Sequence, residues 1–116
     1  MSKTTNTFTL RVSADLKAAF DAFCDERGLS SSGAINMFAT RVINGDILAM
    51  RFDENKKKYG PANTKVVYYL RSAVAERFAE VAENNYGATI SSLLRAFMRH
   101  CADEGDFPFT AQLGQN

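Results

Sequence analysis

Polar and apolar residues change their spacing within residues 7–20, TFTLRVSADLKAAF. The first six of these residues alternate, which is the pattern of a strand that buries one face and exposes the other. From Ser13 onward the apolar residues fall at helical intervals. We therefore expect a strand over residues 7–12 that leads directly into a helix over about 14–27, with Ser13 as its N-cap.

A second helical pattern follows in the first half of the chain. Gly28 is positioned to end the first helix, because glycine adopts the left-handed conformation at low cost. Ser30 is the expected N-cap of a helix over about 31–44, and Gly45 its expected end. The first half is thus predicted to have the order strand, helix, helix.

The same order of chemical types recurs in the second half. When residues 8–46 are aligned with residues 66–106, apolar positions, capping residues and glycines match in sequence. A repeat of this length indicates two copies of one supersecondary unit. The second copy is predicted to contain a strand over 65–70, helices over about 73–85 and 90–103, N-caps at Ser72 and Thr89, and helix ends at Gly87 and Gly105.

Two such copies are expected to fold together. A single short strand has no pairing partner, and two helices cannot cover its apolar face, whereas two copies supply an antiparallel strand pair above four helices. The predicted fold class is therefore mainly α with a two-stranded antiparallel β-ribbon. The expected organisation is a flexible tail (1–6), a first copy (7–52), a polar linker (53–63), a second copy (64–109) and a tail (110–116).

The composition is that of one globular domain. The chain has 116 residues, 46% of them hydrophobic and nine of them Phe, which is enough for a core. A net charge of +1 neither favours nor opposes a nucleic-acid partner. The N-terminus has no hydrophobic signal segment and the sequence has no long apolar run, so we expect a cytoplasmic protein without a membrane partner.

The side chains suited to chemistry are few. Cys24 and Cys101 lie far apart without a CxxC partner, and we predict buried free thiols. His100 is the single histidine, and together with one Cys it is too few ligands for a zinc site. No nucleophile–base constellation and no phosphate-binding glycine loop is present. We expect no metal, no cofactor and no enzymatic activity.

Three short motifs resemble a known superfamily. FTLRVSADL (8–16) resembles the start of the ribbon-helix-helix motif of the Arc/MetJ superfamily, whose members bind DNA. GATISSLLRAF (87–97), followed by DFPF (106–109), resembles the RelB/DinJ antitoxin branch. Members usually carry one copy and dimerise. Two copies in one chain are similar to the tandem arrangement of some plasmid-transfer proteins and imply a pseudo-dimer within one polypeptide.

The resemblance implies that the outer face of the ribbon contacts bases. A two-stranded ribbon fits the major groove of B-DNA, where Arg pairs with guanine and Thr meets several bases. Alternation places Thr7, Thr9 and Arg11 outward, although a polar strand face is also an ordinary solvated one. In the second strand the repeat places Lys65, Val67 and Tyr69 outward, but a slip of one residue in VVYYL would exchange the faces.

Phosphate contacts are a second expectation from the resemblance. In ribbon-helix-helix proteins the start of the second helix clamps the DNA backbone, where free N–H groups favour an anion. Ordinary helix capping explains the same residues equally well. A run of lysines in the linker either follows phosphates or only keeps the linker solvated. The predicted phosphate-contacting residues are Ser30, Ser31, Ser32, Thr89, Lys56, Lys57 and Lys58.

The predicted function is therefore sequence-specific binding of double-stranded DNA, as in a small transcriptional repressor of phage or plasmid type. The alternative is a protein-binding inhibitor or antitoxin-like neutraliser on the same scaffold, since the second strand has an apolar outer face. Antitoxins of the RelB branch wrap their toxin with a long C-terminal segment, whereas only TAQLGQN follows Phe109, so toxin neutralisation is ranked below DNA binding. A plasmid-transfer accessory protein is a third hypothesis, and further homodimerisation is left open.

Overall fold

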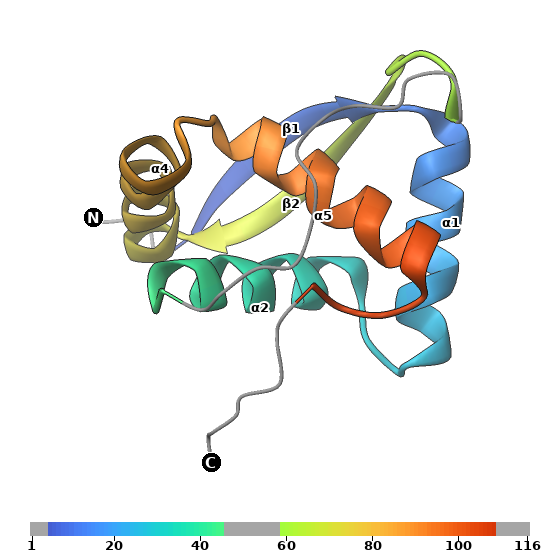
Figure 1. Cartoon of the computed structure of the whole chain (residues 1–116), viewed down its shortest axis with the longest axis horizontal. Coiled ribbons are helices and arrows are strands. Elements are labelled where there is room, and N and C mark those ends of the chain that lie inside the picture. The colour runs from blue at the N-terminus through green and yellow to red at the C-terminus, as the bar shows by residue number, and fades with distance from the viewer. Residues whose placement is uncertain (1–4, 46–58, 109–116) are drawn as a thin grey trace.

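The computed structural model describes residues 5–45 and 59–108. The described chain is mainly helical, with one two-stranded antiparallel sheet and four helices (Figure 1). The order strand, helix, helix occurs twice. The elements are β1 (Thr5–Val12), α1 (Ala14–Glu26), α2 (Ser31–Ile43), β2 (Thr64–Arg71), α4 (Ser72–Tyr86) and α5 (Ile90–Glu104). Each boundary lies within two residues of the one that the sequence predicts.

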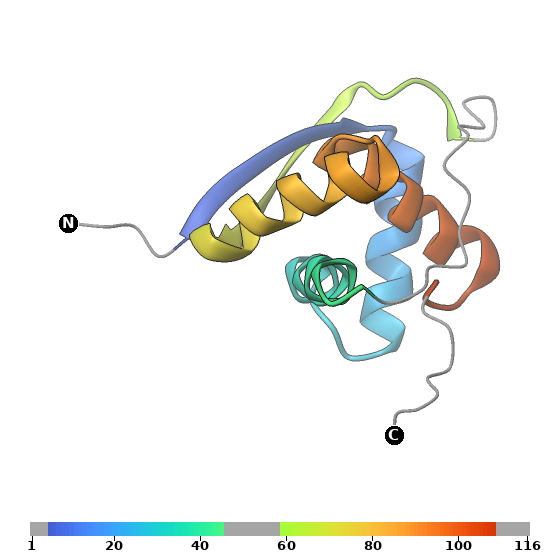
Figure 2. The ribbon, with the colours of Figure 1, turned by 60° about the vertical axis from the view of Figure 1, so that its left-hand side comes forward.

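The two strands form a twisted ribbon that lies along one side of the helices (Figure 2). In the antiparallel register Leu10 lies opposite Val66 and Phe8 lies opposite Tyr68. Leu10 and Val66 are buried beneath the ribbon, as is Tyr68. The register that the sequence left open is thereby settled, because Val67 points away from the core while its neighbours in β2 point into it.

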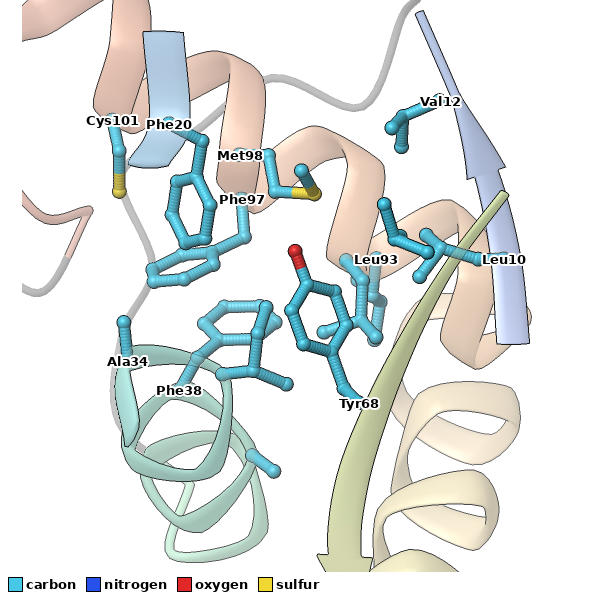
Figure 3. Packing of buried hydrophobic residues seen from close by; sticks show 14 of the residues in the cluster. Leu10, Val12, Phe20, Ala34, Phe38, Tyr68, Leu93, Phe97, Met98 and Cys101 are labelled. Atoms are coloured by element: carbon cyan, nitrogen blue, oxygen red, sulfur yellow. The ribbon is translucent and has the colours of Figure 1, made fainter. Parts of the chain in front are cut away.

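Each helix contributes one fully buried phenylalanine to a shared core, namely Phe20, Phe38, Phe78 and Phe97. Phe38 of α2 stacks on Phe97 of α5, with ring centroids 4.2 Å apart and planes at 17°. Phe20 packs edge-on against Phe97 at 5.7 Å, and Phe78 packs edge-on against Phe38 at 5.9 Å. Figure 3 shows the central rings lying between the ribbon and the helices. Among the described residues, buried side chains from both halves form one cluster.

The packing also joins the end of the first half to the segment that follows α5. The guanidinium of Arg27 lies 4.1 Å from the ring centroid of Phe23 and donates a hydrogen bond of 2.6 Å to the Gly105 carbonyl. Phe107 packs edge-on against Phe23 at 5.1 Å, and Pro108 is buried. Phe107 and Pro108 of the DFPF motif are therefore part of this packing.

Three of the four predicted N-caps are confirmed. The side-chain oxygens of Ser13, Ser30 and Thr89 accept hydrogen bonds of 2.9–3.0 Å from backbone N–H groups three residues later. The prediction of Ser72 as a cap is wrong. β2 extends to Arg71, so Ser72 is already the first helical residue, and Arg71 occupies the cap position without a side-chain capping bond.

The core also contains two buried thiols and one buried hydroxyl. Cys24 and Cys101 are buried and free, and burial raises the pKa of both thiols. The hydroxyl of Tyr68 is buried without a hydrogen-bond partner among the described residues. Burial raises the pKa of this phenol as well, with the Asp21 carboxylate as a smaller cause.

Replacing Phe97 tests whether the halves share one core. Because this ring contacts both Phe20 and Phe38, Phe97→Ala should lower the free energy of unfolding by about 3–5 kcal/mol. Denaturant unfolding of the purified chain, followed by circular dichroism, measures this. Phe97→Leu, which keeps most of the volume, should cost clearly less. A loss below about 1 kcal/mol for Phe97→Ala would contradict a tightly packed ring stack.

Tyr68→Phe should leave the protein as stable as before or more stable, by up to about 1 kcal/mol, because it removes a hydroxyl without a described partner. The pH dependence follows from the raised pKa. As the pH rises, the Tyr68 phenol ionises in the unfolded chain before it ionises in the folded protein. The stability of the folded protein is therefore unaffected by this phenol below pH 10 and falls as the pH rises above 10. Above pH 10, Tyr68→Phe should lose less stability than the original chain in denaturant titrations. Destabilisation by the substitution at pH 7 would indicate that the hydroxyl has a partner.

Candidate binding surface of the ribbon

The exposed side of the ribbon gathers residues from both strands. Antiparallel pairing places Arg11 opposite Lys65 and Thr9 opposite Val67. Side chains of directly opposite residues lie on the same face of a ribbon. We call this surface the outer ribbon face. Its described exposed residues are Thr9, Arg11, Lys65, Val67, Tyr69 and Arg71.

The outer ribbon face has an apolar centre and basic ends. Val67 is 44% exposed and Tyr69 is 57% exposed, and they are the large hydrophobic residues that the described chain leaves exposed. Arg11 and Lys65 lie opposite each other at one end, and Arg71 lies at the other end of β2. Because exposed apolar side chains that lie together can mark an interaction site, the outer ribbon face is a candidate binding surface.

The ribbon is held to the helices by hydrogen bonds that cross between the halves. Asn36 of α2 donates from Nδ2 to the Tyr69 carbonyl of β2 at 2.8 Å. Arg95 of α5 donates from Nη1 to the Arg11 carbonyl of β1 at 3.2 Å. Each bond runs from the second helix of one half to the strand of the other. The backbone that carries Arg11 and Tyr69 is therefore fixed from below, while both side chains face outward.

Five of the six residues predicted to contact bases have described side chains, and all five are exposed. They are Thr9, Arg11, Lys65, Val67 and Tyr69. Thr7 lies opposite Tyr69 in the backbone register, and its side chain is outside the described part of the chain. Whether these residues contact DNA stays a prediction. Arg71 was missed, because the repeat alignment ended the strand at residue 70, although the alternation Lys65, Val67, Tyr69 continues to it.

The residues predicted to contact phosphate are occupied with local structure where they are described. Ser30 and Thr89 cap α2 and α5, and the Thr89 hydroxyl also bonds Ser92. The Ser31 hydroxyl donates to a carboxylate oxygen of Asp21 in α1. Ser32 is half-buried in the first turn of α2. Their phosphate contacts stay predictions. Lys56, Lys57 and Lys58 lie outside the described residues.

Residues 5–45 and 59–108 contain no candidate for a metal site or for a membrane-spanning helix. No group of three or more His, Cys, Asp or Glu side chains there is arranged to hold a metal ion. His100 is half-buried on α5. Within the same ranges, no helix has the length and apolar character needed to cross a membrane.

Comparison with known proteins gives one match. The model of the RelB antitoxin family matches residues 5–59, which is just under half of the chain and includes β1, α1 and α2. No curated protein and no solved structure matches the sequence. The motifs at 87–97 and 106–109, which resemble the RelB/DinJ branch, lie outside the matched range. The match supports an antitoxin-type family similar to ribbon-helix-helix proteins, and it fits an antitoxin-like role at least as well as that of a repressor.

Proposed function

We propose that this chain is an antitoxin-like regulatory protein that binds a protein partner through its outer ribbon face. The scaffold of this proposal is a tandem ribbon-helix-helix unit in which the two halves act as the two subunits of a dimer. The match to the RelB antitoxin model over residues 5–59 supports the assignment to an antitoxin-like class. The exposed apolar centre of the outer ribbon face supports the proposal that the partner is a protein.

The tandem arrangement is supported by contacts between residues that the repeat alignment makes equivalent. Thr9 is aligned with Val67, and these two residues lie directly opposite each other in the ribbon. Phe38 is aligned with Phe97, and their rings stack. Contacts between equivalent positions are what a twofold axis through the centre of a dimer produces.

The exposure of Tyr69 beside Val67 carries the proposal for a protein partner. Tyrosine presents a large contact area with few rotatable bonds, and Tyr and Arg are the residue types enriched at the energetic centres of protein interfaces. The flanking cations Arg11, Lys65 and Arg71 favour a partner whose surface is acidic. Water around the two apolar side chains is released when such a partner covers them.

Tyr69→Ala should weaken this binding by about thirtyfold or more, since a central aromatic residue typically contributes roughly 2 kcal/mol or more. The full chain is used to capture proteins from the cells that express it. The captured partner is then purified and titrated by calorimetry. Arg77→Ala is the control, because Arg77 is exposed on α4 and does not belong to the outer ribbon face. Equal affinities for the original chain and Tyr69→Ala would contradict the proposed surface.

DNA binding is the second candidate, favoured by the opposition of Arg11 and Lys65 beside Thr9. These are side chains that contact guanine, phosphate and thymine in a major groove. Selection of bound sequences from random duplex DNA tests it. Under this candidate, Arg11→Ala should lower affinity for the selected sequence by about tenfold and relax its preference, whereas Arg77→Ala should change little.

The two experiments separate the two candidates. A stoichiometric protein that Tyr69→Ala loses, with no duplex sequence enriched, supports the antitoxin-like role. An enriched duplex sequence that Arg11→Ala loses, with no stoichiometric protein captured, contradicts that role and supports the repressor.

A further inference from the structure

A pocket of about 520 Å³ lies at the end of the ribbon where Arg11 is located. Three parts of the chain form it: the junction of β1 and α1, the middle of α5, and residues 59–62 before β2. Figure 1 shows the segment before β2 beside the start of α1. The lining residues that matter here are Arg11, Ser13, Tyr59, Pro61, Arg95 and Arg99. The size is within the range of small-molecule sites.

The pocket is strongly basic. Arg95 and Arg99 lie one turn apart on α5, and Arg11 borders the same pocket at the end of β1. Among the described residues that line it, none is acidic. The bond from Arg95 to the Arg11 carbonyl keeps the strand end and the helix together at this point. Guanidinium groups match the geometry of phosphate oxygens, to which they donate paired hydrogen bonds.

The start of α1 adds to the positive potential. Ser13 lines the pocket and caps this helix of 13 residues. The N-terminal end of a helix has a partial positive charge, which favours an anion within the first turn. In this pocket the partial positive charge at the start of α1 adds to the charges of the lining arginines.

Tyr59 brings one carboxylate close to the pocket, although none of the lining residues is acidic. The Tyr59 hydroxyl donates to a carboxylate oxygen of Asp103. Burial, and then this carboxylate, raise the pKa of Tyr59 to about 12, so the phenol is neutral at pH 7. The Tyr59 ring and Pro61 add apolar surface to the lining of the pocket. A ligand with an anionic group at one end and a flat apolar group at the other would match a pocket that has both arginines and apolar surface.

A second pocket, of about 550 Å³, provides an internal comparison near Arg71. The repeat alignment pairs Arg95 with Asn36 and Arg99 with Thr40, and both Asn36 and Thr40 line this second pocket. The two α5 guanidiniums are therefore replaced by neutral side chains at the aligned positions of α2. The second pocket is lined by Arg41 and Arg71, so the feature that distinguishes the pocket beside Arg11 is the arginine pair on α5.

We propose that the pocket lined by Arg11, Arg95 and Arg99 binds a phosphate group. A small phosphorylated ligand the size of a mononucleotide is one source of that group, and the backbone of a nucleic acid lying against the ribbon end is the other. The proposal does not depend on the protein partner proposed above, because that partner is tested through Tyr69 and this site through α5.

Titration of the full chain with adenosine monophosphate, inorganic phosphate and adenosine at low salt tests the first source. Adenosine monophosphate should bind most tightly, inorganic phosphate more weakly and adenosine not at all. Arg99→Thr and Arg95→Asn introduce the residues found at the aligned positions of α2. Each should weaken binding of adenosine monophosphate by about tenfold, because each removes a charge-assisted hydrogen-bond donor. Arg77→Thr, an exposed arginine elsewhere, should leave it unchanged.

Arg99→Thr is the decisive variant, since Arg95 also supports the ribbon and its loss can disturb the fold. Circular dichroism verifies that each variant is folded. The same variants are then titrated with a 20-base-pair duplex at several salt concentrations. One outcome is that the duplex binds and adenosine monophosphate does not. If Arg99→Thr then lowers the slope of log affinity against log salt concentration by about one, the phosphate group comes from nucleic acid. If Arg99→Thr binds all probes as the original chain does, or if Arg77→Thr weakens them equally, the proposal is wrong.

Discussion

The pairing of β1 with β2 is the interaction on which the remaining structure depends. Each strand alone would expose a row of unpaired backbone groups and an apolar face. Their union provides one ribbon whose buried side, with Leu10 and Val66 opposite each other, belongs to the same buried cluster as Phe38 and Phe97. Since those rings come from α2 and α5, the ribbon and the core each need both halves of the chain. The core and the outer ribbon face therefore both depend on the pairing of the two strands.

The same pairing creates the chemistry of the surface. Residues more than fifty positions apart in sequence become direct neighbours, so that Lys65 lies beside Arg11 and Val67 lies beside Thr9. Below the ribbon, Asn36 and Arg95 hold the strand carbonyls in place. A surface held in this way loses little conformational entropy on binding, which favours affinity.

Much of this fold can be predicted from the sequence, because its signals are local. The change of period at Ser13 marks the strand-to-helix junction, and Ser30 and Thr89 mark helix starts by the capping bonds that they make. Alternation alone left the face of VVYYL undecided, since Val and Tyr are compatible with either side of a ribbon. The tertiary contact of Tyr68 with the core decides it. Ser72 was misassigned because the strand continues one residue beyond the repeat boundary. The arginine pocket is invisible in sequence, since its members come from three separate segments.

Isotope-filtered nuclear Overhauser spectroscopy on a mixture of labelled and unlabelled chains tests the central claim most directly. The account predicts backbone contacts between Thr9 and Val67, and between Arg11 and Lys65, within one chain, and no such contacts in the filtered spectrum that reports only pairs between chains. If these contacts appear between chains, or are absent altogether, the ribbon is not formed by the two halves of a single polypeptide and the account is contradicted.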